Sequence, residues 1–274
     1  MDATRLRLRF GTDGTADPIP PPTLPGVTIF PGAAGAVSGP VRVRGMELPT
    51  CDNPVTVIRG DCREWLPLIP AGVVGTVITD PPYGIAYATN FAVGGVGATW
   101  QNRPIANDDD TAARDDVLAW ARSRELPWAC FGSWKAPKPA GIRGVLIWDK
   151  GPAFGMGDLS FPWKGSWEEI YVGGQGWRGH RDEGVLRGHL VHSHESRGRT
   201  HPTEKPVSLL RHFIRKLPPD AVILDPFAGT GATGVAAVIE GRQAILIEQD
   251  ERYIPTIRRR IAEAMGTGLL AGIA

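Results

Sequence analysis

The chain has 274 residues, of which 42% are hydrophobic and 22% charged, and its formal net charge is +1. This composition is typical of a soluble globular protein, and no run approaches the ~20 apolar residues of a membrane span. The near-zero charge provides no general basic surface, so any contact with nucleic acid must come from local patches. Three scattered cysteines argue against a disulfide framework or a cysteine-rich zinc site. The N-terminus lacks a signal-peptide pattern, which predicts a cytoplasmic protein.

Residues 1–53 differ in composition from the rest of the chain. Five prolines fall between positions 18 and 25, and a stretch rich in glycine and alanine follows. Such a segment buries little apolar surface and favours extended, polyproline-like backbone. We predict a flexible N-terminal arm at 1–53, to which no function is assigned, and a single domain at 54–274.

After the arm, short apolar runs alternate with segments of helical spacing. The apolar runs predict strands at 55–58, 73–79, 127–131, 144–148, 169–172, 221–224 and 244–247. Helical spacing predicts helices at 207–217, 233–240 and 253–265. Continuous apolar strands suit a mostly parallel sheet covered on both faces, and their alternation with helices predicts an α/β, doubly wound fold.

The clearest ligand-binding pattern follows the strand expected at 221–224. Asp225 ends that strand, and a turn with Gly229 and Gly231 leads into a helix. Glycines let the backbone approach a ligand closely, at the edge where open α/β sheets bind ligands. The next strand ends at Glu248, where a carboxylate can accept hydrogen bonds from ribose hydroxyls.

The same glycines also fit a different class of enzyme. Gly229, Gly231 and Gly234 spell G-x-G-x-x-G, and Glu248 stands at the distance typical of dinucleotide-binding folds. A nicotinamide-dependent oxidoreductase is therefore one alternative. Asp225 argues against it, because a carboxylate there repels pyrophosphate but can face the cationic end of a methionine group.

A second pattern, Asp80-Pro81-Pro82-Tyr83, follows the strand expected at 73–79. Methylation of an exocyclic base amine is difficult because the nitrogen lone pair is delocalised into the ring, and acceptors for the amine hydrogens draw it back. Asp80 can supply one acceptor, and the Pro81 carbonyl, aimed by the stiff Pro-Pro step, can supply another. Tyr83 can stack on a base that has left the duplex. Such stacking stabilises the base by roughly 1–3 kcal/mol, which offsets part of the free energy needed to unstack and unpair it. The alternative is a plain Asx-Pro turn, but four suitable residues together favour amine methylation.

Together these two patterns resemble the amino-methyltransferase family of DNA modification enzymes. The catalytic pattern precedes the cofactor pattern, which resembles the beta-type order of that family. Further segments are similar to family motifs: Arg59-Gly60-Asp61-Cys62, His201-Pro202-Thr203-Glu204-Lys205-Pro206, Ile247-Glu248-Gln249-Asp250 and, as in phage and restriction-modification members, Pro104-Ile105-Ala106-Asn107-Asp108. The resemblance covers roughly residues 55–265.

The resemblance implies a Rossmann-like S-adenosylmethionine-dependent methyltransferase fold, with direct transfer to nitrogen. It implies a base-amine site of Asp80, Pro81, Pro82 and Tyr83, with Asp80 also bordering the cofactor. It implies that Asp61 lies near the cofactor adenine, Glu248 near the ribose and Thr203 and Lys205 near the methionine carboxylate. The full implied cofactor site is Asp61, Cys62, Asp80, Thr203, Lys205, Pro206, Asp225, Phe227, Ala228, Gly229, Thr230, Gly231, Glu248 and Gln249.

Family members often carry a sizeable target-recognition region, whereas here only a short insert near 177–200 and a glycine-rich stretch at 87–110 remain. The arginines of the insert are candidate contacts to phosphates and bases, with a solvated loop as an equal alternative: Arg178, Arg181, Arg187, Arg197 and Arg199. Histidines lie among them, but no cysteine or carboxylate completes a coordination set, so we expect no metal. We expect Trp163, Trp167 and Trp177 in the core, and Arg258, Arg259 and Arg260 solvated or near a helix end.

The sequence therefore predicts a site-specific DNA methyltransferase acting on the N6 amine of adenine in a base flipped out of double-stranded DNA. It would work in the cytoplasm of a bacterium or of a phage-infected cell. Asp rather than Ser before Pro-Pro-Tyr leans toward adenine, and cytosine-N4 methylation is the alternative. A non-catalytic DNA- or cofactor-binding module is the alternative from another class. The recognition sequence, a cognate nuclease, and a homodimer or recognition subunit are left open.

Overall fold

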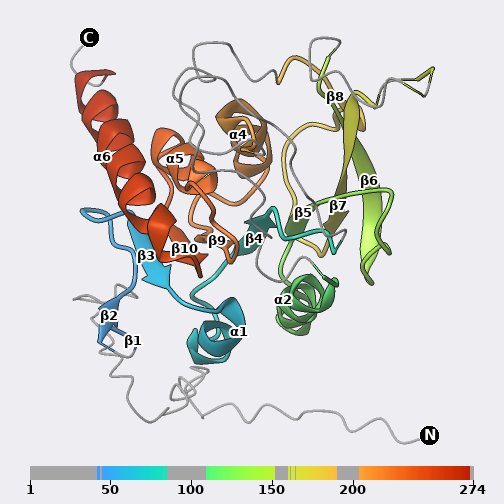
Figure 1. The fold of residues 1–274 in the computed structure, drawn as a ribbon. Coiled ribbons are helices and arrows are strands. Elements are labelled where there is room, and N and C mark those ends of the chain that lie inside the picture. The colour runs from blue at the N-terminus through green and yellow to red at the C-terminus, as the bar shows by residue number, and fades with distance from the viewer. Residues whose placement is uncertain are drawn as a thin grey trace, which may run out of the picture. The chain divides into compact units, whose positions relative to one another are not determined.

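Figure 1 shows the computed structural model of the chain, which describes residues 42–43, 45–84, 109–151, 160, 162–163, 165–189 and 204–271. The chain divides into two compact units, Met1–Met46 and Glu47–Ala274. Strands β1 (Arg42–Val43) and β2 (Met46–Glu47) form a two-stranded sheet. The predicted arm lies mostly outside the described residues, and so does the family-like loop at 104–108, so both stay predictions.

The second unit is built around an eight-stranded sheet with the order β3-β10-β9-β4-β5-β7-β6-β8. Its strands are β3 (Val55–Arg59), β4 (Thr76–Thr79), β5 (Trp128–Gly132), β6 (Ile142–Asp149), β7 (Trp167–Gly173), β8 (Val185–Leu186), β9 (Ile223–Asp225) and β10 (Ala244–Glu248). The first five strands of this order run parallel, and β7 runs antiparallel between β5 and β6. The amino end of β7 therefore lies at the same edge of the sheet as the carboxyl ends of β4 and β5.

Helices cover both faces of this sheet. In Figure 1, α4, α5 and α6 lie together on one side of the strands, and α1 and α2 lie on the other. The helical segments are α1 (Cys62–Trp65), η1 (Leu66–Leu68), α2 (Ala112–Ser123), α4 (Val207–Ile214), α5 (Ala232–Ile239), η2 (Glu251–Tyr253) and α6 (Ile254–Ala271). This arrangement confirms the predicted α/β, doubly wound, mostly parallel fold.

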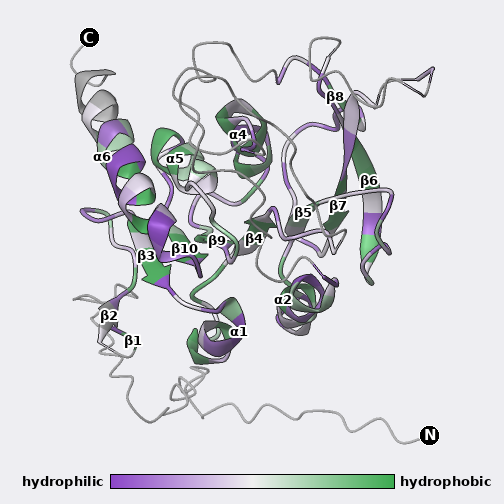
Figure 2. Ribbon diagram, viewed as in Figure 1, coloured by the Kyte–Doolittle hydropathy of each residue, from purple (hydrophilic) through white to green (hydrophobic). Residues whose placement is uncertain are grey.

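The core lies along the central strands and the helices that face them. Every residue of β4 and β9 is buried, as are the first four residues of β10. Figure 2 shows these strands and most of α5 as hydrophobic. Burial on both faces explains why the strands read as unbroken apolar runs rather than as alternating ones. Within the described residues, no helix has the length and apolar character needed to cross a membrane.

The ten predicted strands and helices are all present, with shifted ends, but α1, α2 and β8 were not predicted. The buried residues of α2 include Ala113, Val117, Leu118 and Ala121. Their spacing is helical, so α2 could have been predicted from the sequence. Strand β8 has only two residues, and it is a strand because it pairs with β6. The local sequence contains no pattern that predicts this pairing.

The prediction that three tryptophans lie in the core is wrong for two of them. The side chains of Trp163 and Trp167 are 72% and 43% exposed. Trp167 is the first residue of β7, and Trp163 lies four residues before it. Trp177 does pack against the core, and its indole N–H donates to the Gly173 carbonyl at 3.0 Å.

Candidate active site

Four neighbouring parallel strands each end in an acidic side chain. Glu248 and Asp225 are the last residues of β10 and β9, Asp80 directly follows β4, and Asp61 lies two residues past β3. Because these strands are adjacent and parallel, the four carboxylates lie along one edge of the sheet. Open α/β sheets bind their ligands at this edge, outside the carboxyl ends of the strands.

The turn between β9 and α5 is shaped by two glycines with left-handed backbone. The φ angles are 52° at Gly229 and 83° at Gly231, which caps α5. A Cβ added at Gly231 would stand 3.0 Å from Ile257, whereas one added at Gly229 would meet no atom within 4 Å. Gly231 therefore permits close packing of α6, and Gly229 leaves the loop backbone open to a ligand.

Asp225 is buried at the end of β9, with 3% of its surface exposed. Its Oδ1 accepts hydrogen bonds from the Thr79 hydroxyl at 2.7 Å and the Phe227 amide at 3.2 Å. Burial raises the pKa of Asp225 to about 6, although hydrogen bonds from Thr233 and Thr79 oppose the rise. A cation placed beside this carboxylate would favour its charged form, so the position suits a positively charged ligand group.

Glu248 joins the ends of two strands to the glycine turn. Its Oε2 accepts a hydrogen bond from the Gly229 amide at 2.6 Å, and its Oε1 accepts one from the Asp250 amide at 2.8 Å. Burial raises the pKa of Glu248 to about 7, against the effect of these two hydrogen bonds. The Glu248 carbonyl also accepts from the Gly60 amide at 3.0 Å, which brings the Asp61 segment to the same place.

Asp61 and Cys62 begin the short helix α1. Asp61 caps it by accepting from the Arg63 amide at 2.9 Å, and its ion pair with Arg63 lowers the pKa of its carboxyl. Cys62 is buried, and burial raises the pKa of its thiol to about 12. The thiol therefore stays protonated.

The other predicted cofactor residues that the structure describes lie at the same edge. They are Phe227, Ala228 and Thr230 in the β9–α5 turn, Gln249 directly after β10, and Lys205 and Pro206 directly before α4. Thr203 lies outside the described residues, and its predicted contact stays a prediction.

Asp80 sits in a cluster with Tyr83 and Lys205. The Tyr83 hydroxyl donates to Asp80 Oδ1 at 2.8 Å, and Lys205 Nζ lies 2.7 Å from Asp80 Oδ2 and 3.2 Å from the Tyr83 oxygen. Burial raises the pKa of Asp80, against the charge of Lys205, and raises the pKa of Tyr83 well above its usual value. Burial would lower the pKa of Lys205, but the carboxylates around it outweigh that effect and raise it. Lys205 is therefore an ammonium ion, and both oxygens of Asp80 are engaged.

Two further residues of this cluster, Glu168 and Lys150, were missed in the sequence. Glu168 Oε1 accepts from the Tyr83 hydroxyl at 3.3 Å and lies 3.4 Å from Lys150 Nζ, and Glu168 Oε2 lies 3.5 Å from Lys205 Nζ. Lys150 follows β6 and Glu168 stands near the start of β7, on strands that pair antiparallel. Lys150 and Glu168 are each a charged residue near the end of a predicted strand, which was the only sign in the sequence that they could belong to the site. Neither residue belongs to a recognisable motif.

Arg260 also has a role that its sequence context did not reveal. Its Nη1 donates to the Thr230 carbonyl at 3.0 Å and the Thr230 hydroxyl at 2.8 Å, and its Nη2 pairs with Glu204. The expectation that it is solvated or placed near a helix end is wrong, because α6 continues well past it and turns it toward the β9–α5 loop. Arg260 thus ties that loop to the segment before Lys205.

The candidate DNA-contacting segment is only partly described. Arg178, Arg181 and Arg187 are exposed, and Arg187 pairs with Glu183 at 3.1 Å. Part of this segment is not a free insert, because Val185–Leu186 forms β8 at the edge of the central sheet. Arg197 and Arg199 lie outside the described residues. Among the residues that the structure does describe, no group of side chains could hold a metal ion.

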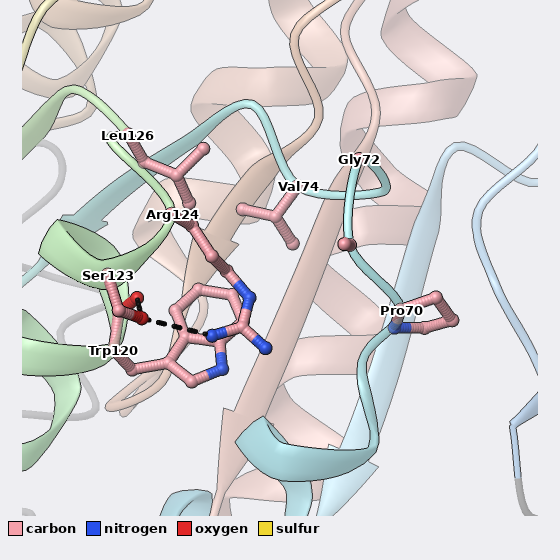
Figure 3. A pocket seen from close by; sticks show the side chains of 8 residues that line it. Pro70, Gly72, Val74, Trp120, Ser123, Arg124 and Leu126 are labelled. Atoms are coloured by element: carbon pink, nitrogen blue, oxygen red, sulfur yellow. Dashed lines mark hydrogen bonds between the residues drawn. The ribbon is translucent and has the colours of Figure 1, made fainter. Parts of the chain in front are cut away.

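A pocket of about 290 Å³ lies at the opposite edge of the sheet (Figure 3). Trp120 and Arg124 from the end of α2 line it, and the Arg124 guanidinium lies 4.2 Å from the centre of the Trp120 ring. Val74 and Leu126, which also line it, precede β4 and β5, so the pocket is at the amino ends of these strands. It takes no part in the arrangement of carboxylates described above.

The sheet order, the glycine turn after β9 and the acidic strand ends define a Rossmann-like methyltransferase fold. A family model described as DNA methylase matches residues 146–259. The match spans less than half of the chain, and over these residues the chain is similar to the N6/N4 DNA amino-methyltransferases.

Individual relatives agree with this assignment. The chain is 28% identical over 223 residues to the proposed methylase YubD of Escherichia coli (strain K12), covering 75% of this chain and 89% of YubD. It is 44% identical over 62 residues to the DNA adenine methyltransferase YhdJ of the same strain, covering 22% of this chain and 21% of YhdJ. The solved structure of the M1.HpyAVI complex with S-adenosylmethionine has a TM-score of 0.55 at 18% identity, covering 76% of this chain and 98% of that one, which shows a shared fold.

Proposed function

We propose that the chain is a site-specific DNA methyltransferase that moves a methyl group from S-adenosylmethionine to the N6 amine of adenine. The observation that carries this proposal is the direct link between its two half-sites. The Thr79 hydroxyl donates to Asp225 at 2.7 Å, and the residue after Thr79 is Asp80. A donor held at Asp225 and an amine held at Asp80 would thus meet at the ends of two adjacent strands, β9 and β4. Placing two reactants side by side is a large part of what catalysis of such a transfer requires.

The residues on the donor side fit S-adenosylmethionine, the donor of this family. When bound, this cofactor supplies an electrophilic methyl group on a positively charged sulfur. Asp225 offers a buried carboxylate that a cation would stabilise, and Gly229 leaves the loop backbone accessible. Each oxygen of Glu248 accepts one backbone hydrogen bond, and a carboxylate has about four acceptor positions, so capacity remains for ribose hydroxyls.

The residues on the acceptor side fit an exocyclic amine. Asp80 would accept a hydrogen bond from one amine hydrogen and the Pro81 carbonyl from the other, drawing the lone pair back onto nitrogen. Tyr83 stays protonated because its pKa is raised, so its neutral ring is suited to stack on a base that has left the duplex. The ammonium of Lys205, 2.7 Å from Asp80, favours the charged form of this carboxyl and opposes the rise in its pKa that burial causes.

Adenine is favoured as the target by two observations. Asp80 precedes Pro-Pro-Tyr, where cytosine-N4 enzymes more often resemble Ser-Pro-Pro-Tyr. YhdJ, with which the chain shares a segment, is named a DNA adenine methyltransferase. Cytosine-N4 methylation uses the same amine chemistry within the same family, and it is the second candidate.

Double-stranded DNA, with the target base flipped out, is the proposed partner. The exposed Trp167 at the amino end of β7 and the exposed Arg187 directly after β8 lie at the same edge of the sheet as Asp80, and they offer aromatic and charged contacts. A homodimer or a recognition subunit would supply further contacts, and a phage or restriction-modification setting in a bacterial cell suits the activity. The complete acidic and aromatic set at Asp80 and Tyr83 argues against a module that only binds DNA or cofactor.

The test is nucleoside mass spectrometry of unmethylated DNA incubated with the protein and S-adenosylmethionine. We expect N6-methyladenine with the wild type and with Asp116→Ala, an exposed change on α2, and about 10²–10³-fold less with Asp80→Ala. N4-methylcytosine would keep the chemistry and change the base. No methylated base, with donor binding intact, would favour the binding module.

A further inference from the structure

Glu168 occupies a position from which it can reach the same groups as Asp80. It is the second residue of β7, whose amino end lies at the carboxyl edge of β4 and β5. Its side chain is 14% exposed. The Tyr83 hydroxyl lies 2.8 Å from Asp80 and 3.3 Å from Glu168, so the two carboxylates flank one phenol.

One oxygen of Glu168 lacks a hydrogen bond. Oε2 is buried and has no hydrogen-bond partner among the described residues, although Lys205 Nζ stands 3.5 Å away. A buried acceptor without a donor is costly, and in native proteins such a group often marks a functional site. The nearest charged donor is Lys205, which already forms an ion pair with this oxygen at 3.5 Å, and a small movement would convert the ion pair into a hydrogen bond.

The proposed chemistry creates a need for that movement. Both oxygens of Asp80 are engaged, Oδ1 by the Tyr83 hydroxyl and Oδ2 by Lys205. Each oxygen keeps an acceptor position for the target amine, but the Lys205 ammonium would repel the positive charge that develops on the amine nitrogen during methyl transfer, so withdrawal of Lys205 from Asp80 favours the reaction. Lys205 is 6% exposed, and a buried ammonium that loses its closest counter-ion without a replacement is strongly disfavoured. Release of Asp80 therefore requires a second carboxylate for Lys205.

Resting on the proposed function, we propose that Glu168 is a positioning residue that receives the Lys205 ammonium when Asp80 takes up the target amine. Lys205 Nζ then passes from Asp80 Oδ2 to Glu168 Oε2, the oxygen without a hydrogen bond. Lys150, 3.4 Å from Glu168 Oε1, holds Glu168 in place during the exchange. Two carboxylates and two ammonium groups are present before and after, so no net charge is created in the buried site.

The test separates Glu168 from its neighbour Glu169. Glu169 is 7% exposed and points to the other face of β7, where it accepts from the Tyr171 hydroxyl at 2.5 Å and lies 3.5 Å from Lys138. Steady-state methylation of DNA is measured for the wild type, Glu168→Gln, Glu168→Asp and Glu169→Gln. Donor affinity and melting temperature are measured for each protein.

We expect Glu168→Gln to lower kcat by about 10- to 100-fold, with KM for DNA and donor affinity within about twofold of the wild type. Glu168→Asp should regain part of the loss, because it restores the charge, and Glu169→Gln should retain kcat. A merely structural role would instead lower the melting temperature and donor affinity together, with no recovery in Glu168→Asp. That result, or an unchanged kcat in a folded Glu168→Gln protein, would overturn the inference while the wild type still methylates DNA. A wild type that makes no methylated base would overturn the proposed function itself.

Discussion

The two halves of the sheet edge hold their acidic groups in different ways. On the donor side, formed by β3, β10 and β9, Asp225 and Glu248 accept hydrogen bonds from backbone amides and from the Thr79 hydroxyl. On the acceptor side, formed by β4, β5, β7 and β6, Asp80 and Glu168 face the ammonium groups of Lys205 and Lys150. Amides and hydroxyls place no full positive charge beside the donor-side carboxylates, whereas the acceptor-side carboxylates are already paired with ammonium ions. Under the proposed function, the donor side could accept a cationic ligand without rearrangement, and the acceptor side would exchange ion-pair partners when the substrate binds.

Among the changes considered on the donor side, removal of the charge of Asp225 should weaken donor binding most. Asp225→Asn leaves the shape but removes the carboxylate that favours a cationic ligand, so the Kd for S-adenosylmethionine should rise about 10- to 100-fold. Calorimetric titration measures this directly. Asp220→Asn, an exposed change in the turn before β9, is the matched control and should bind like the wild type. Equal affinity in Asp225→Asn would mean that the donor is held elsewhere.

A change at Arg260 should show how far donor binding depends on the contacts that hold the β9–α5 loop in place. Arg260→Met removes the bonds to Thr230 and Glu204 without touching the strand ends. We expect donor affinity to fall about 3- to 10-fold, corresponding to one or two ordinary hydrogen bonds. Arg259→Met, which loses only an exposed pair with Glu263 at 2.6 Å, should leave affinity unchanged. If both variants behave alike, the loop does not depend on α6.

The smallest effect should appear in the pH dependence of stability at Glu248. Burial raises its pKa to about 7, so its ionisation opposes folding as pH rises from the ordinary carboxyl range to about 7. Glu248→Gln cannot ionise and avoids that loss. The melting temperature of the variant minus that of the wild type should therefore grow by roughly 2–4 °C between about pH 5 and about pH 8. A difference that stays constant with pH would show that the backbone hydrogen bonds keep Glu248 ionised throughout.

The same contrast explains what could be predicted from the sequence. Asp225, Gly229 and Glu248 were found because strand, turn and carboxylate follow one another along the chain, and local order fixes their geometry. The exposure of Trp163 and Trp167 was not predicted, because it depends on how distant segments pack around the amino end of β7. Glu168 was missed because its contacts with Tyr83 and Lys205 join segments that are far apart in the sequence. Hydrogen bonds and ion pairs between distant strands leave no periodic signal, and only the assembled sheet brings them together.

The pairing of β4 with β9 has a consequence for how the protein is made. Thr79 and Asp225 are 146 residues apart in sequence, yet they touch at the centre of the sheet. A ribosome adding about 5–20 residues per second needs roughly 7–30 seconds to travel that far. Throughout this interval β4 has one edge without its final neighbour, and such an edge is prone to pair with other chains. The centre of the sheet is therefore completed only after β9 has been synthesised, and translation interrupted before β9 would leave the edge of β4 without its partner strand.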